Sequence, residues 1–164
     1  MKLLRVGELG AETVAALDSN NIVRDLSDHI KDLNPQTINE ETFNKLKRIK
    51  LSELKKINSN IRIGACISNP VDFLAIGLNY KAHAEGTKSK LPTEPIVFNK
   101  SSGCIQGPND QIVKPKSASK MDYEVEVGMI IGRKGKYIKE ENAQDYVFGY
   151  CIVNDISERS WQKE

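Results

Sequence analysis

Alternating hydrophobic and polar positions predict strands at the start of the chain. Residues 2–7 (KLLRVG) read as one strand, and residues 12–18 and 21–27 read as a hairpin around an Asn-rich turn. Asn favours such turns because its short polar side chain tolerates a positive φ and bonds to the local backbone. We therefore expect a small antiparallel sheet in this part of the chain.

A change in the hydrophobic spacing then predicts helix. Apolar residues recur at the three- to four-residue spacing of one helical face over residues 39–49, where Asn39 stands in the N-cap position. Residues 51–57 (LSELKKI) predict a second short helix, with Ser52 as its cap. Together with the strands, this pattern predicts a small N-terminal α/β domain over residues 1–62.

Short β-rich runs separated by turn signals dominate the second predicted domain, residues 63–164. One helix, Glu140 to Tyr146 with Gly149 as its stop, interrupts them, and residues 158–164 read as the start of another helix. Strands without regularly alternating helices favour an α+β fold with a β roll over a doubly wound sheet. The predicted strands lie within residues 61–67, 72–80, 95–100, 103–107, 111–115, 123–132 and 150–157.

The composition excludes several classes of protein. The chain has 164 residues, of which 39% are hydrophobic and 28% charged, and its formal net charge is +2. That charge is too small to indicate a nucleic-acid partner, and no apolar run approaches the roughly 20 residues of a membrane span. Arg5 and Glu8 interrupt the apolar run at the N-terminus, so it does not read as a secretory signal. We expect a cytoplasmic protein that binds neither nucleic acid nor membrane.

Three cysteines, Cys66, Cys104 and Cys151, stand far apart, and each has apolar neighbours. None forms a C-x-x-C pair, which argues against a zinc knuckle or a redox dithiol. Buried, reduced thiols are the simplest expectation for a cytoplasmic protein.

The segment 123–132 (YEVEVGMIIG) carries the most informative carboxylates. Glu124 and Glu126 are two residues apart, so they share one face of the predicted strand while Val125 and Val127 share the other. If the strand is central and buried, the two carboxylates repel each other and need a cation nearby. If it is an edge strand with the valines inward, the glutamates simply face solvent.

Asp155 adds a third carboxylate at the end of the strand predicted over residues 150–157. It either joins the two glutamates at a metal ion or caps the segment that follows. Three carboxylates without a His or Cys ligand suit a hard, oxygen-seeking ion. The expected cofactor is therefore Mg²⁺ or Mn²⁺, with Ca²⁺ as a third option, rather than zinc.

His83 follows the strand predicted over residues 72–80 and comes soon after the pair Asn79 and Tyr80. Loops after strand ends often carry function, and the ordinary near-neutral pKa of a histidine side chain suits a general base. A lone histidine is more often a surface or core residue. His29 has no such neighbours, and we expect it to be a surface residue.

Several segments, taken in order, resemble the catalytic domain of the fumarylacetoacetate hydrolase family. They are GLNYKAHAE, EPIVFNKSS, GPND, DYEVEVGMIIG and DYVFGYCIVNDIS. The resemblance runs from about Phe73 to the end of the sequence, and the opening MKLLRVG is similar to the small N-terminal domain of shorter bacterial members. It implies a β roll of mixed sheets, incomplete here because family members continue well beyond this point, and a homodimer for the full-length protein.

The resemblance also implies roles for the candidate residues. In the family, the E-x-E strand and the later Asp bind Mg²⁺ or Mn²⁺, and the His after Asn-Tyr activates water. A Glu three residues after that His orients it, but this chain has Gly86 there, so the adjacent Glu85 is the candidate substitute. Carried over by motif position, the metal ligands are Glu124, Glu126 and Asp155, the catalytic residues are His83, Glu85 and Lys100, and the residues that shape the substrate site are Asn79 and Tyr80.

Members of the family cleave C–C bonds of fumarylacetoacetate and acylpyruvates, decarboxylate oxaloacetate, or isomerise related diacids. The resemblance therefore implies a divalent-metal-dependent hydrolase that acts on a small-molecule 2-oxo or β-diketo acid. Two alternatives stay open. One is a lyase, isomerase or decarboxylase for related diacids, of the ureidoglycolate lyase or 2-hydroxyhepta-2,4-diene-1,7-dioate isomerase type. The other is an inactive metal-binding fragment.

Overall fold

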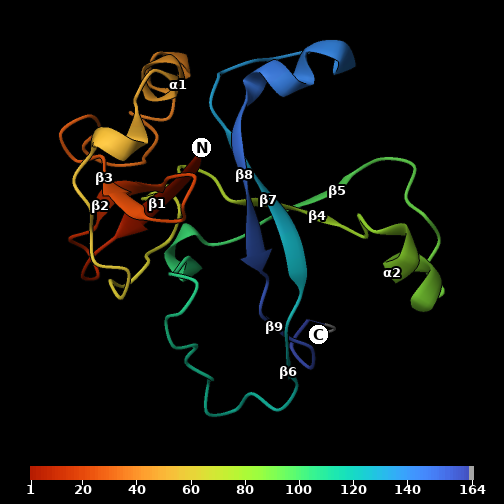
Figure 1. The fold of residues 1–164 in the computed structure, drawn as a ribbon. Helices are drawn as coiled ribbons and strands as arrows, with labels where there is room; N and C mark the ends of the chain where they lie inside the picture. Colours follow the sequence, from red (N-terminus) through yellow and green to blue (C-terminus); the bar gives the residue numbers. More distant parts are fainter. Residues whose placement is uncertain (163–164) are drawn as a thin grey trace. The chain divides into compact units, whose positions relative to one another are not determined.

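The computed structural model describes residues 1–162, and these form two compact units (Figure 1). One unit comprises Met1–Ser68 together with the described residues from Gly107 onward, and the other comprises Asn69–Gln106. Strands and short helices are mixed along the chain, as the predicted α+β class requires. No helix within residues 1–162 has the length and apolar content that a membrane crossing needs. The domain boundary expected between residues 62 and 63 stays a prediction.

Three antiparallel strands form the sheet predicted at the start of the chain: β1 (Lys2–Val6), β2 (Thr13–Leu17) and β3 (Val23–Asp25). β2 pairs with β1 on one side and with β3 on the other. Asn21 adopts a positive φ of 58° in the turn between β2 and β3, a conformation that Asn tolerates better than most residues. The predicted hairpin with its Asn-rich turn is therefore confirmed.

Helix α1 (Glu40–Lys47) begins directly after Asn39, whose side chain accepts a hydrogen bond from the amide of Thr42 at 2.9 Å. The predicted N-cap is thus confirmed. α1 buries Leu46 in a core cluster shared with β2 and the segment that follows β3. Removing these apolar side chains from water is a main source of stability for this unit. The buried members of the cluster are Val14, Ala16, Leu26, Ile30, Leu33, Ile38 and Leu46.

Two predicted helix boundaries are wrong. Ser52 does not cap a helix, because Leu51–Glu53 form a single 3₁₀ turn without a side-chain cap. Gly149 does not end a helix either. Glu140–Tyr146 form a 3₁₀ helix that leads directly into strand β8 (Val147–Asn154), and Gly149 lies inside that strand. At Gly149 the pairing of β8 with β7 outweighs the local preference of glycine for a helix end.

Some short runs that predicted strands form none. The run 103–107 contributes a 3₁₀ turn at Ser102–Cys104, and the run 111–115 is a loop. The run 61–67 contributes one isolated bridge, between Ile63 and Val6. Within the described part of the chain, the runs 103–107 and 111–115 pair with no strand, and the run 61–67 pairs with β1 only at this bridge.

Two very short strands lie near the end of the described chain. β6 (Met121–Asp122) pairs antiparallel with β9 (Ser157–Glu158). The helix predicted over residues 158–164 therefore begins as strand β9. A turn follows, in which the amides of Trp161 and Gln162 both donate to the carbonyl oxygen of the last residue of β9. The remainder of that predicted helix, residues 163–164, lies outside the described residues.

A long antiparallel pair, β7 (Val125–Ile131) and β8, carries the E-x-E segment (Figure 1). Within residues 1–162 each of these strands pairs only with the other. Val125 and Val127 are 66% and 60% exposed, whereas Glu124 and Glu126 are half-buried. Neither alternative drawn from the sequence is right as stated. The strand is not central within the described residues, and its valines do not point inward.

The half-buried face of this pair rests on the N-terminal part of the same unit. Ile130 of β7 and Phe148 of β8 pack against the core cluster around α1. Phe148 also meets Phe43 of α1 edge to face, with 5.9 Å between the ring centroids. Because Ile130 and Glu126 share a face of β7, this packing fixes Glu126 on the half-buried face as well.

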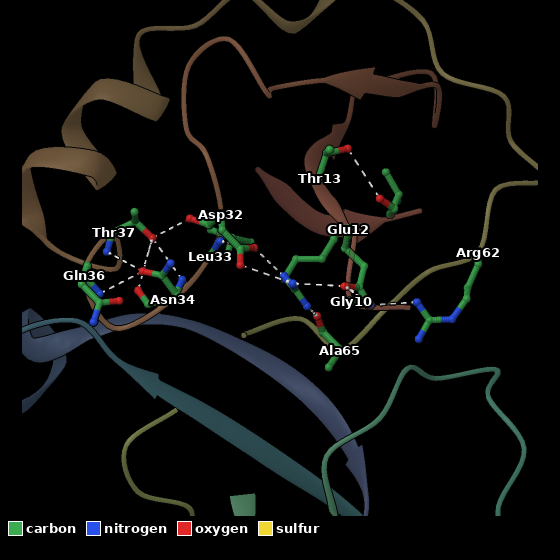
Figure 2. Close-up of polar contacts among 12 residues, drawn as sticks. Gly10, Glu12, Thr13, Asp32, Leu33, Asn34, Gln36, Thr37, Arg62 and Ala65 are labelled. Carbon is green, nitrogen blue, oxygen red and sulfur yellow. Dashed lines mark hydrogen bonds and ion pairs between the residues drawn. The ribbon is translucent and has the colours of Figure 1, made fainter. Parts of the chain in front are cut away.

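Ion pairs join the N-terminal sheet to the loops around it (Figure 2). Buried Arg5 of β1 donates to Asp32 at 2.6 Å and lies 3.4 Å from a carboxylate oxygen of Glu12. Arg62 donates to the other oxygen of Glu12 at 2.9 Å and to Asp110 at 2.6 Å. Asp110 ends a Gly-Pro-Asn-Asp turn, in which its main-chain amide donates to the carbonyl oxygen of Gly107 at 3.2 Å. The network therefore connects segments that are distant in the sequence within one unit.

The unit Asn69–Gln106 contains one strand pair and one α-helix. β4 (Leu74–Gly77) pairs antiparallel with β5 (Ile96–Asn99), and α2 (Lys81–Gly86) lies between these strands in the sequence. The predicted strands at 72–80 and 95–100 are confirmed in shortened form.

The cysteines are less buried than the sequence predicts. Cys66 and Cys104 are exposed, and Cys151 is half-buried. The prediction of buried thiols is therefore wrong. At Cys66 the reason is visible: the neighbouring Ile67 takes the position that packs against the core cluster.

Candidate functional site

Three carboxylates lie at one end of the β7–β8 pair. Glu126 is opposite Val153 in the register, and continuing that register by two residues places Glu124 opposite Asp155. The main-chain amide of Asp155 donates to the carbonyl oxygen of Glu124 at 2.8 Å. Because directly opposite residues of an antiparallel pair share a face, Glu124, Glu126 and Asp155 all project from the half-buried face.

Arg159 interacts with one of these carboxylates. Its guanidinium forms an ion pair with Glu124, and its Nε donates to Asp122 at 2.9 Å. The hydrogen bond from Arg159 lowers the pKa of the Asp122 carboxyl. Partial burial opposes the charge of Arg159, but its hydrogen bonds to Asp122 and Glu124 outweigh that effect and raise its pKa. This corner of the site therefore carries paired charges of both signs.

Sequence analysis did not identify Arg159 as part of this site. The only signal in the sequence is its spacing of four residues after Asp155. The pairing of β6 with β9, which brings Arg159 alongside residues 121–124, depends on tertiary structure.

The three carboxylates share a face but do not converge on one point. Within residues 1–162, no group of three His, Cys, Asp or Glu side chains is placed to hold a metal ion. The donor set itself fits a hard cation, because it consists of half-buried carboxylates on one strand pair. Binding an ion would require Glu124 to leave Arg159 and the side chains to turn toward each other.

The remaining candidate residues belong to the unit Asn69–Gln106. Asn79, Tyr80 and His83 follow β4 and are all exposed. Leu78, between β4 and Asn79, adopts a φ of 49°, which is strained for a bulky residue. Strained corners of this kind cluster at functional sites, so the turn supports a functional role for this loop.

Glu85 does not face His83 on helix α2. Its carboxylate lies 3.8 Å from the ammonium of Lys81, one helical turn earlier. Residues two apart on a helix point in different directions. The role of Glu85 as a substitute for the glutamate absent at Gly86 stays a prediction, and this geometry does not favour it.

Lys100 follows β5 at the other end of the same strand pair. Its main-chain amide donates to the carbonyl oxygen of Phe73 at 2.7 Å, and its ammonium lies 5.8 Å from the centre of the Phe98 ring. Asn79 and Tyr80 follow the end of β4 that lies away from Lys100. The length of β4, about 10 Å at the usual rise per residue, therefore separates the backbone of Lys100 from the backbone of Asn79 and Tyr80.

Comparison with known proteins identifies relatives of the chain. Residues 72–164 match the family model described as fumarylacetoacetate (FAA) hydrolase, C-terminal. A provisionally named hydrolase of Burkholderia orbicola (strain MC0-3) is 46% identical over 164 residues, which cover all of this chain and 58% of that protein. The chain therefore spans less than two thirds of the length of the curated relatives that it matches.

Solved structures share the fold of the chain. Fumarylacetoacetate hydrolase from Exiguobacterium antarcticum matches with a TM-score of 0.78 and 24% identity, over 99% of this chain and 58% of that one. A 2-hydroxyhepta-2,4-diene-1,7-dioate isomerase from Mycobacterium marinum matches with a TM-score of 0.71 and 25% identity, over 99% and 57%. Maleylpyruvate hydrolase from Sphingobium sp. SYK-6, in complex with manganese(II) and pyruvate, matches with a TM-score of 0.76 and 20% identity, over 97% and 60%.

Proposed function

Because this chain belongs to the fumarylacetoacetate hydrolase family, we propose that the full-length protein is a divalent-metal-dependent hydrolase. Its proposed substrate is a 2-oxo or β-diketo acid, in which it cleaves a C–C bond. The observation that carries the proposal is the common face of Glu124, Glu126 and Asp155 on the β7–β8 pair. The manganese and pyruvate bound to a structural neighbour support the metal and the ligand class.

Glu124, Glu126 and Asp155 are the proposed ligands of Mg²⁺ or Mn²⁺. When bound, the ion supplies a Lewis acid for the oxygens of the substrate. Carboxylates suit these ions because both prefer hard oxygen donors. Arg159 keeps Glu124 paired with a positive charge, so the half-buried carboxylate is not left uncompensated.

His83 is the proposed general base. Its exposed imidazole accepts a proton from water, whose oxygen then attacks the substrate carbonyl carbon. Asn79 and Tyr80 precede α2 at the strained corner and are proposed to contact the substrate. Lys100 is proposed to bind a substrate carboxylate through its ammonium group. Glu85, which pairs with Lys81, would act on His83 only after a change of side-chain conformation.

The test is turnover of acetylpyruvate and fumarylacetoacetate by the full-length protein in the presence of Mg²⁺ or Mn²⁺. We expect Glu126→Gln to lower kcat/KM by about 100-fold or more, and His83→Gln to lower kcat by about 100-fold. The matched controls are Glu141→Gln and His29→Gln, which change residues outside the proposed site and should leave both constants unchanged. Full activity of a folded Glu126→Gln variant would remove the metal site from the proposal.

Product analysis separates the proposed hydrolase from its alternatives. Release of pyruvate or fumarate with one water consumed supports hydrolysis. An isomerised or decarboxylated diacid would instead identify the lyase, isomerase or decarboxylase alternative. Metal binding by residues 1–164 alone, without turnover of any substrate that the full-length protein converts, would identify this chain as an inactive metal-binding fragment.

A further inference from the structure

The structure brings together two cysteines that the sequence keeps far apart. Cys66 lies just after the bridge between Val6 and Ile63, and Cys151 lies in the middle of β8. Ile67, the neighbour of Cys66, packs against the same core cluster as Ile130 of β7 and Phe148 of β8, and the two thiols are close enough that each shifts the pKa of the other. Both belong to the unit that contains the N-terminal sheet and the β7–β8 pair.

The backbone on both sides holds the two thiols in place. The amide of Gly64 donates to the carbonyl oxygen of Arg5 at 2.8 Å, and the amide of Ser68 donates to that of Leu33 at 2.7 Å. Cys66 is therefore fixed between two hydrogen-bonded residues. Across the strand pair, Cys151 lies opposite a glycine in the register of β7.

Gly128 leaves the space that the Cys151 sulfur occupies. A Cβ at this position would lie 2.7 Å from Sγ of Cys151 and 2.8 Å from Cγ2 of Val153. Real carbon atoms do not approach this closely, so any other residue would push the thiol or the strand aside. The glycine thus keeps Cys151 within reach of Cys66.

The surroundings favour Cys66 as the nucleophile of the pair. Arg5 donates to the carbonyl oxygen of Ala65 at 3.3 Å, which places its positive charge beside Cys66, the next residue in the chain. The interaction with Cys151 and the charge of Arg5 lower the pKa of the Cys66 thiol to about 7. The pKa of Cys151 is raised by the same interaction and by burial. An exposed thiolate is the form of cysteine that peroxides oxidise.

We propose that Cys66 and Cys151 form an intramolecular disulfide when the protein meets hydrogen peroxide or an organic hydroperoxide. The Cys66 sulfur attacks one peroxide oxygen, the O–O bond breaks, and water or an alcohol leaves. The Cys151 sulfur then attacks the resulting sulfenic acid and releases one water. The two thiols lose two protons and two electrons in total, and the peroxide takes up both.

The disulfide would connect two segments that lead to the proposed site. Cys66 lies shortly before the unit Asn69–Gln106, which carries His83 and Lys100. Cys151 lies on β8 four residues before Asp155, on the same half-buried face as Glu126. The inference itself rests on the paired thiols and not on the proposed hydrolase activity.

Peptide mapping under non-reducing conditions tests the proposal. The folded protein is treated with hydrogen peroxide, free thiols are blocked with N-ethylmaleimide, and the digest is analysed by mass spectrometry. We expect a cross-linked peptide pair that contains Cys66 and Cys151, lighter by two hydrogens than the sum of the reduced peptides. Dithiothreitol should abolish it. Two of the three thiols per chain should disappear, while Cys104 remains free to react.

Matched variants keep the result interpretable. Cys104→Ser changes the third, exposed cysteine, and the cross-link should form in it unchanged. Cys66→Ser and Cys151→Ser should each lose the cross-link, and circular dichroism should show that both remain folded. The wild-type map decides the question if either variant fails to fold. Oxidation of Cys66 to sulfinic acid without a cross-link, or a disulfide that involves Cys104 or a second chain, would overturn the proposal.

Discussion

Arg159 forms an ion pair with Glu124, one of the three carboxylates proposed to hold a metal ion. The same guanidinium donates to Asp122 at 2.9 Å, so one arginine compensates two neighbouring carboxylates. Arg159 and a divalent cation would therefore compete for Glu124. Its charge would also repel a cation bound nearby.

This competition predicts how a substitution at Arg159 changes metal affinity. Arg159→Met should tighten Mn²⁺ binding about tenfold, or roughly 1.4 kcal/mol, because it removes both the competitor and a nearby positive charge. Isothermal titration calorimetry of the two proteins measures the difference. Arg48→Met, which removes an exposed arginine on the C-terminal side of α1, is the control and should not change the affinity. Weaker binding by Arg159→Met would mean that Arg159 positions Glu124 for the ion.

Two glycines in the β7–β8 pair should respond differently to alanine. Gly128→Ala should lower the free energy of unfolding by about 1–3 kcal/mol, because its Cβ would lie 2.7 Å from Sγ of Cys151. Gly149→Ala should be neutral or slightly stabilising, since no neighbouring atom lies within 4 Å of the place that its Cβ would take and alanine restricts the unfolded chain. Urea unfolding followed by circular dichroism compares them. Equal effects of the two substitutions would contradict the close packing at Gly128.

The buried ion pairs of Arg5 predict a second difference in stability. Arg5→Met leaves the carboxylates of Glu12 and Asp32 without this partner, and we expect a loss of about 2 kcal/mol. The value is at the low end for a buried pair for two reasons. Glu12 keeps its ion pair with Arg62, and the side chain of Asp32 is partly exposed. Lys50→Met removes an exposed pair with Glu53 and should change stability by less than about 0.5 kcal/mol. Chemical denaturation would contradict this account if both variants lost the same amount.

The Arg62–Asp110 pair predicts how acid affects stability. The hydrogen bond from Arg62 lowers the pKa of Asp110 from its ordinary value of 3.8. A carboxyl group whose pKa is lower in the folded state stabilises the fold above its unfolded pKa and loses this contribution as the pH falls through the folded pKa. The free energy of unfolding should therefore decrease as the pH falls below 3.8.

Arg62→Gln provides the comparison for this pH dependence. Without the arginine, the pKa of Asp110 should return toward its ordinary value, so the decrease in stability between pH 5 and pH 3 should be shallower than in the wild type. Urea unfolding at a series of pH values measures both slopes. Parallel slopes would show that the pair contributes nothing to the acid sensitivity.

Local features were predictable from the sequence because they depend on neighbouring residues. Asn39 caps α1 and Asn21 takes the positive φ of the β2–β3 turn, and both follow from the chemistry of the Asn side chain. The two-residue spacing of Glu124 and Glu126 likewise fixed their common face. The family resemblance extended this reading to Asp155, which the register places across from Glu124.

Features that depend on distant partners were not predictable in this way. The outward direction of Val125 follows from the packing of the opposite face on the core around α1, and Gly149 lies in a strand because β8 pairs with β7. The ion pair of Arg159 and the thiol pair of Cys66 depend on segments far apart in the sequence. The homodimer and the assigned roles of the site residues remain predictions.

Binding of Mn²⁺ to the full-length protein, followed by electron paramagnetic resonance of the free ion, tests the central claim most directly. We predict one bound ion per chain and at least tenfold weaker binding in Glu124→Gln, Glu126→Gln and Asp155→Asn. Glu141→Gln, which removes an exposed carboxylate, should bind as the wild type does. Unchanged binding in all three site variants, or no binding by the folded wild-type protein, would contradict the account.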